Sequence, residues 1–114
     1  MFKLESSDGY WYSVPVEQRD ENGKLYKQFF DLRFKRMKQS EMLALVEKMK
    51  ANEINDVDLL CTLALNWRKV SLDGVSETPF SDTAAREFFD QERIARAVVA
   101  AWMESVTPTA KAKN

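Results

Sequence analysis

The chain has 114 residues, which is enough for one hydrophobic core and too little for two. Hydrophobic residues make up 45% and charged residues 31% of it, ordinary values for a folded protein, so extensive disorder is not expected. The net charge of -1 argues against a dedicated nucleic-acid binder. We expect a single domain over residues 1–106 and a flexible tail over residues 107–114.

Reactive side chains are scarce. Histidine is absent, and the one cysteine, Cys61, lies in an apolar run, where a buried thiol is expected rather than a nucleophile. Two acidic pairs, Asp56/Asp58 and Asp90/Glu92, fall near predicted helix N-termini, which acidic residues stabilise. The few glycines fit turns rather than a phosphate-binding loop. The sequence therefore predicts no catalytic residues, no metal site and no cofactor.

Targeting and membrane segments are not expected either. The N-terminal residues contain no apolar run of the kind that forms the core of a signal peptide. The longest apolar stretch, residues 97–103, is far shorter than the roughly 20 residues that span a bilayer. A single cysteine also suits a reducing compartment. These features predict an intracellular protein that does not bind membranes.

The first third of the chain has the pattern of a β-hairpin. In residues 10–17, apolar side chains occupy every second position, as in a strand with one buried face: Tyr10, Tyr12, Val14 and Val16. Asn22-Gly23 supplies the turn, and residues 24–36 form the return strand with Phe30, Leu32 and Phe34 on one face. Pro15 cannot donate a backbone hydrogen bond, so the first strand is expected at an edge.

Helical patterns fill most of the remaining sequence. Ser40 is the expected N-cap of a first helix, whose apolar stripe is Met42, Leu43, Val46 and Met49. Asn55 is the expected N-cap of a second, central helix that continues through Trp67. Ser81 and Asp90 are the expected N-caps of two further helices. The predicted fold class is α+β, an N-terminal β-hairpin followed by a bundle of about four α-helices.

Aromatic residues are the remaining resource for binding. Trp102 lies among the apolar residues of the last helix and is expected in the core. Trp67 ends the predicted central helix, where its indole is expected to be half exposed, and Trp11 lies on the second face of the edge strand. With residues 68–79 read as a short hairpin or compact loop, the predicted partner-binding residues are Trp11, Phe29, Trp67 and Leu72.

Charge is unevenly distributed along the chain. Residues 19–38 carry seven basic and three acidic groups, whereas residues 51–92 carry three basic and nine acidic groups. Two ordinary solvated faces would explain this, as would binding of a charged partner or self-association of the chain. A single-strand nucleic-acid platform around Tyr26 and Phe29 is disfavoured, because the basic residues are sparse and the chain is acidic.

An ordered set of short motifs resembles the tail assembly chaperones of long-tailed bacteriophages. The set begins with Phe30-Asp-Leu-Arg-Phe-Lys-Arg-Met37 and a Ser-Glu helix start. It continues with Asn66-Trp-Arg-Lys-Val-Ser-Leu-Asp-Gly-Val75 and Thr78-Pro-Phe-Ser81. It ends with a helix of small residues and an aromatic, Ile94-Ala-Arg-Ala-Val-Val-Ala-Ala-Trp102. The resemblance covers about two thirds of the chain and rests on the order of the pieces, because the family has no catalytic signature.

This resemblance implies a non-enzymatic protein of the bacterial cytoplasm that acts while the phage tail is built. Members of the family bind the long tape measure protein, keep it soluble and help tail tube subunits to polymerise around it. Many are made in two lengths by programmed ribosomal frameshifting. An alanine codon ending in A, followed by AAA and AAC, would encode Ala112-Lys113-Asn114 and read A-AAA-AAC, a sequence on which ribosomes slip. The alternative expectation is a small adaptor module without catalytic activity, whose hairpin edge docks a partner strand.

Overall fold

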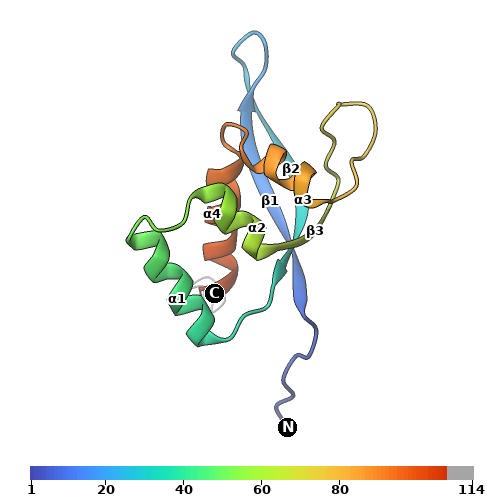
Figure 1. Ribbon diagram of the computed structural model, residues 1–114. Helices are drawn as coiled ribbons and strands as arrows, with labels where there is room; N and C mark the ends of the chain where they lie inside the picture. The colour runs from blue at the N-terminus through green and yellow to red at the C-terminus, as the bar shows by residue number, and fades with distance from the viewer. Residues whose placement is uncertain (108–114) are drawn as a thin grey trace, which may run out of the picture.

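The computed structural model describes residues 1–107, so the expected flexible tail lies outside the described residues except for Thr107. The fold is α+β, as predicted, with an N-terminal hairpin and four helices (Figure 1). A third strand completes an antiparallel sheet of order β1-β2-β3. The elements in chain order are β1 (Gly9–Arg19), β2 (Leu25–Lys35), α1 (Gln39–Lys50), α2 (Asp56–Leu63), β3 (Ala64–Arg68), α3 (Asp82–Phe89) and α4 (Ile94–Val106).

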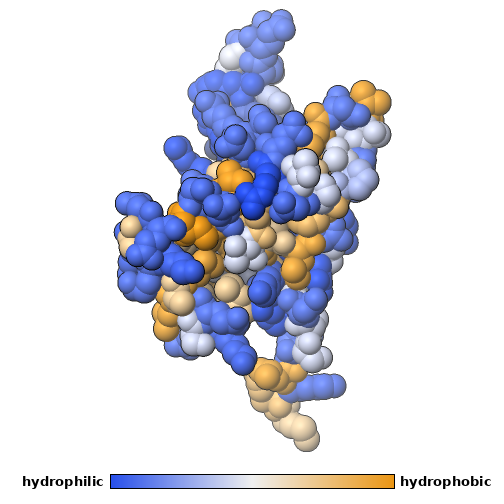
Figure 2. All heavy atoms as spheres, viewed as in Figure 1, coloured by the Kyte–Doolittle hydropathy of each residue, from blue (hydrophilic) through white to orange (hydrophobic). Residues whose placement is uncertain are grey.

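The hairpin forms where the alternating pattern predicts it. Strands β1 and β2 pair over their full length, with Val14 opposite Phe30. In the turn, the Gly23 N–H donates to the Asp20 carbonyl at 2.9 Å, and Gly23 has a φ of 82° that suits glycine. The tip of the hairpin projects beyond the helices (Figure 1), and Figure 2 shows that it is hydrophilic on the face in view.

Strand β3 corrects the prediction of one central helix running from Asn55 through Trp67. Helix α2 ends at Leu63, and the next five residues pair antiparallel with β2, placing Trp67 opposite Leu32. A short apolar run fits either a buried helix or a buried strand, so its periodicity did not distinguish the two. Pairing with β2 satisfies the backbone of this segment and part of the β2 edge at once.

Two of the predicted helix caps are confirmed. The Asn55 side chain accepts a hydrogen bond from the Asp58 N–H at 2.8 Å, at the start of α2. The Ser81 hydroxyl accepts one from the Ala84 N–H at 3.1 Å, at the start of α3. Both residues leave the backbone extended just before the helix, which lets a short polar side chain reach its first turn.

The other two predicted caps are wrong. Helix α1 begins one residue before Ser40, with Lys38 at the N-cap position. The backbone N–H of Lys38 donates to the Glu41 carboxylate at 2.9 Å. Asp90 ends α3 instead of starting α4, whose N-cap is Arg93 with a left-handed φ of 71°. In both places the residue type was suitable for a cap, but the chain path set the helix start elsewhere.

The core lies between the sheet and the helices. Trp102 is 1% exposed, as expected of a core residue, and α4 packs along β1. Helix α1 contributes little: its one buried side chain is Leu45, whereas Leu43, placed in the predicted stripe, is 56% exposed. The buried residues are Val14, Val16, Phe30, Leu32, Phe34, Leu45, Leu59, Leu60, Leu63, Ala64, Trp67, Val70, Ala85, Phe89, Ile94, Val98, Ala101 and Trp102.

Candidate functional site

The two faces of the sheet differ sharply. Alternate side chains point to opposite faces of a strand, so the pairing register sorts them into an inner and an outer set. The inner face is packed against the helices along most of its length, whereas Tyr26 and Gln28, near the hairpin turn, are exposed. We define the outer face by the remaining alternate residues: Trp11, Ser13, Pro15, Phe29, Asp31, Arg33, Asn66 and Arg68. Within residues 1–107 this face is not covered by a helix, and it leaves Trp11 36% and Phe29 57% exposed.

Trp11 is held in place by a cation from the third strand. The Arg68 guanidinium lies 3.8 Å from the centroid of the indole ring, a close cation–π contact. Arg68 also pairs with Asp31 at 3.6 Å, and the Lys69 ammonium lies 3.4 Å from the same carboxylate. The aromatic side chain is thus oriented but still accessible, because half of the Arg68 side chain is itself exposed.

Phe29 forms the second apolar position of the outer face. It lies directly opposite Pro15 in the register of the hairpin, and both side chains are exposed. The Lys27 ammonium is 5.9 Å from the Phe29 ring centroid. The outer face therefore combines exposed apolar groups with cations at their borders, an arrangement that suits protein–protein contact better than catalysis.

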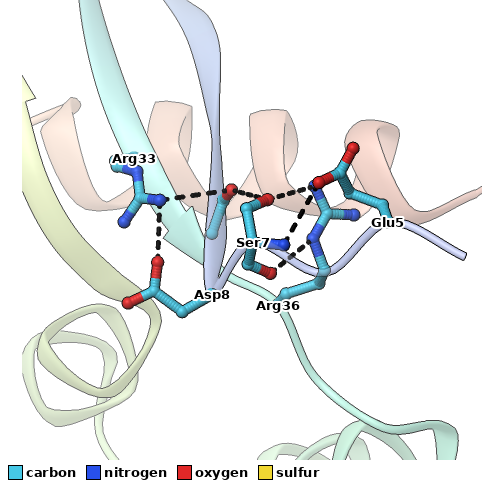
Figure 3. Close-up of polar contacts among 6 residues, drawn as sticks. Glu5, Ser7, Asp8, Arg33 and Arg36 are labelled. Atoms are coloured by element: carbon cyan, nitrogen blue, oxygen red, sulfur yellow. Dashed lines mark hydrogen bonds and ion pairs between the residues drawn. The ribbon is translucent and has the colours of Figure 1, made fainter.

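The N-terminal segment is fastened to the end of the sheet by polar contacts (Figure 3). Arg33 pairs with Asp8 at 2.7 Å, and the Arg36 side chain donates from Nε to the Ser7 carbonyl at 3.2 Å. The hydrogen bond from Arg33 lowers the pKa of the Asp8 carboxyl below its usual value. Asp8 therefore stays ionised and is a weaker base, so this cluster tethers the chain instead of transferring protons.

Trp67 is buried, so the expectation of a half-exposed indole is wrong. Only 3% of it is exposed, and its indole N–H donates to the Thr78 carbonyl at 2.7 Å. Its ring meets Phe80 and Phe88 edge to face, at centroid distances of 5.0 and 5.3 Å. The strand pairing of β3 turns this side chain toward the inner face, where it anchors the loop that follows.

Leu72 lies in that loop, residues 69–79, which is compact and is not a hairpin. The Asp73 carboxylate accepts hydrogen bonds from the Val75 N–H at 2.8 Å and the Ser76 N–H at 3.1 Å. These bonds, together with one from the Ser71 hydroxyl, lower the pKa of Asp73 to about 2. Leu72 is 37% exposed on the wall of a groove that Phe29 also lines.

This groove has a volume of about 760 Å³. It lies between the half of the hairpin nearest the turn, the 69–79 loop and the turn that joins α3 to α4. Its apolar lining comes from Val16, Phe29, Phe30, Val70, Leu72, Phe88 and Ile94. Charged or amide side chains, among them Arg19 and Glu87, also line it, and the groove is open to solvent.

Chemical groups for catalysis are few in the described part of the chain. Cys61 is partly exposed, not fully buried as expected, and desolvation raises the pKa of its thiol, which disfavours the reactive thiolate. No three His, Cys, Asp or Glu side chains among residues 1–107 are placed to hold a metal ion. In the same residues, no helix is both long enough and apolar enough to cross a membrane.

The structure brings some of the four predicted binding residues together and separates others. Trp11 and Phe29 share the outer face, Phe29 also lines the groove with Leu72, and Trp67 lies in the core. Sequence reasoning missed Arg68, whose stacking on Trp11 depends on a strand that the pattern did not reveal. No family model, no curated protein and no solved structure matches the chain.

Proposed function

We propose that this protein is a tail assembly chaperone of a long-tailed bacteriophage. In this function it binds the tape measure protein in the bacterial cytoplasm, keeps it soluble and assists assembly of tail tube subunits around it. The chain does this by contact alone, without catalysis, cofactor or nucleic acid. Self-association of the chaperone is compatible with the same surface.

The observation that carries this proposal is the uncovered outer face of the sheet. Trp11 and Phe29 are exposed there although the core nearby is well filled. A tape measure protein is long and helical, so its unassembled apolar face associates with itself unless another surface occupies it. Aromatic anchors bordered by cations suit that role, since aromatic residues contribute much of the energy of protein interfaces and charges tune selectivity.

The residues that carry the family resemblance support the proposal by acting together. Trp67 donates to the Thr78 carbonyl and packs on Phe80, which precedes the Ser81 cap of α3. Asp73 closes the turn between them. The motifs within residues 66–81 therefore form one structural unit, in which each motif contacts another. These contacts give a physical reason for the motifs to occur together and in this order.

The test is co-expression with the long helical protein encoded directly downstream. We expect the partner to be soluble only with the chaperone present. Replacing both Trp11 and Phe29 by alanine should weaken binding about tenfold or more, because two interface anchors are lost. Leu43 and Val75, also exposed apolar residues but outside the outer face, provide the matched control pair, and their alanine variants should bind like the wild type.

The possible outcomes test the chaperone function and the assignment of binding to the outer face separately. If the partner is equally soluble without this protein, the chaperone proposal is wrong. If solubility requires the protein but tolerates the loss of Trp11 and Phe29, the function stands and the assignment to the outer face is wrong. If the chain instead captures other proteins and ignores the downstream one, it is an adaptor module. Circular dichroism of each variant confirms that it is folded.

A further inference from the structure

The central strand β2 is paired on both sides along only part of its length. Strand β3 lies beside residues 31–34, with Arg68 opposite Asp31, and it ends there. The next residue, Lys69, has a φ of 67°, a left-handed conformation that turns the chain away from β2. Among the described residues, 25–30 of β2 are therefore paired with β1 alone.

The direction of the backbone groups on this free edge follows from the register. At the two ends of the hairpin, the Asp20 N–H donates to the Lys24 carbonyl at 3.0 Å, and the Arg36 N–H donates to the Asp8 carbonyl at 2.9 Å. Hydrogen-bonded pairs alternate with non-bonded pairs in an antiparallel ladder. The even-numbered residues of β2 therefore bond to β1, and the peptide groups of Lys27 and Phe29 point to the free edge.

Pro15 provides an independent check of this alternation. It lies opposite Phe29, and a proline has no N–H to donate, so this pair must be a non-bonded one. Within residues 1–107, the N–H and C=O groups of Lys27 and Phe29 thus have no strand partner, and they recur at the spacing of a β-ladder. An open strand edge of this kind is a template for another extended chain.

The groove lies along this edge. Val16 and Phe30 from the hairpin and Phe88 from α3 form its apolar floor, while Val70 and Leu72 form the opposite wall. Its volume of about 760 Å³ falls in the usual range for ligand sites. An added strand would direct every second side chain onto this floor and the others to solvent.

We propose that the free edge of β2 binds an extended peptide segment of a partner protein by strand addition. The segment forms main-chain hydrogen bonds with Lys27 and Phe29 and carries apolar side chains at alternate positions, which enter the groove. A second copy that docks through its outer strand β1 is a poorer occupant, because Pro15 interrupts that strand. The site borders the outer face, since Phe29 belongs to that face and also lines the groove, but it does not depend on the chaperone function.

The test uses an mRNA-displayed library of random ten-residue peptides, selected on the immobilised full chain. The key variant is Lys27→Pro, which removes an edge N–H but no hydrogen bond to β1, and Lys27→Ala is the control for the lost charge. We expect enriched peptides with alternating apolar residues. Their affinity should fall about tenfold in Lys27→Pro and change less than about threefold in Lys27→Ala.

A second measurement does not depend on whether the proline variant folds. In the wild-type protein, a selected peptide should slow amide hydrogen exchange at Lys27 and Phe29 by about tenfold or more, and leave Trp11 unchanged. The proposal is overturned if no peptide is enriched, or if enriched peptides protect other amides only. A further contrary result is a dimer of the chain that protects the same two amides without peptide. The edge would then bind a second copy of the chain, and the proposal of a separate partner would also be overturned.

Discussion

The sheet has an inner half, where β3 lies beside β2, and an outer half, where β1 and β2 continue alone toward the hairpin turn. These halves divide the strands along their length, unlike the two faces, and they differ in how completely they are covered. In the inner half, three strands meet, Leu32 and Phe34 are fully buried, and α4 packs against β1. In the outer half, two strands continue alone, and Leu25, Tyr26 and Phe29 are 39–57% exposed. The same hairpin thus serves as a core element at one end and as an accessible surface at the other.

The cause of the difference is local. Strand β3 ends at Lys69, whose left-handed backbone leads into a loop that closes on itself through Asp73 and is anchored by Trp67. Backbone groups that β3 would otherwise satisfy are left free on β2. The early turn therefore leaves an open strand edge in the outer half of the sheet.

The largest expected effect tests the inner half. Trp102 is 1% exposed and packs α4 onto the sheet, so Trp102→Ala should lower the free energy of unfolding by about 3–5 kcal/mol. Trp11→Ala, on the outer face, should cost about 1 kcal/mol, chiefly the lost stacking with Arg68. Urea unfolding measures both. A loss below about 1 kcal/mol for Trp102→Ala would show that α4 is not part of the core.

A smaller effect is expected at Gly9, where β1 enters the inner half. A Cβ at this position would lie 2.7 Å from the Phe34 carbonyl oxygen and 2.7 Å from Leu65 Cδ1. Since the first contact is with backbone, Gly9→Ala should destabilise the protein by about 1–3 kcal/mol. Ser13→Ala, at an exposed position of the same strand, should change stability by less than about 0.5 kcal/mol. Equal thermal stability of the two variants would contradict the close approach of the Phe34 backbone and the Leu65 side chain to Gly9.

The smallest effect concerns the loop that ends the third strand. The pKa of Asp73 is lowered from 3.8 to about 2, so its ionised form favours the folded loop. This contribution is complete above pH 3.8 and is lost as the pH falls toward 2. Carbon NMR should give the low pKa directly, and Asp73→Asn should remove the pH dependence of the loop resonances in this range. A titration near 3.8 would mean that the turn is not closed by this carboxylate.

Local signals in the sequence predicted the elements that depend on local chemistry. The hairpin follows from alternation around Asn22-Gly23, and the caps at Asn55 and Ser81 follow from short polar side chains before helical segments. The cap assigned to Ser40 failed because the Glu41 side chain already accepts from the Lys38 N–H at the start of α1, and the cap assigned to Asp90 failed because Asp90 ends α3.

The elements that sequence reasoning missed depend on distant partners. The run from Leu59 to Trp67 is apolar except for Thr62 and Asn66, and pairing with the free edge of β2 makes its last part a strand. The burial of Trp67 and the contact of Arg68 with Trp11 both follow from that pairing. Of the candidate binding residues, Trp11 and Phe29 are exposed on the hairpin, as their prediction requires, whereas Trp67 was misplaced together with its strand.

The contrast between the two halves of the sheet is tested most directly by native-state amide exchange of the free protein. On β2, the account predicts slow exchange at Asp31 and Arg33, which β3 covers, and at Gln28, which bonds to β1. It predicts fast exchange at Lys27 and Phe29, whose N–H groups face the free edge. Protection of Lys27 and Phe29 as strong as that of Asp31 and Arg33 would contradict the open edge.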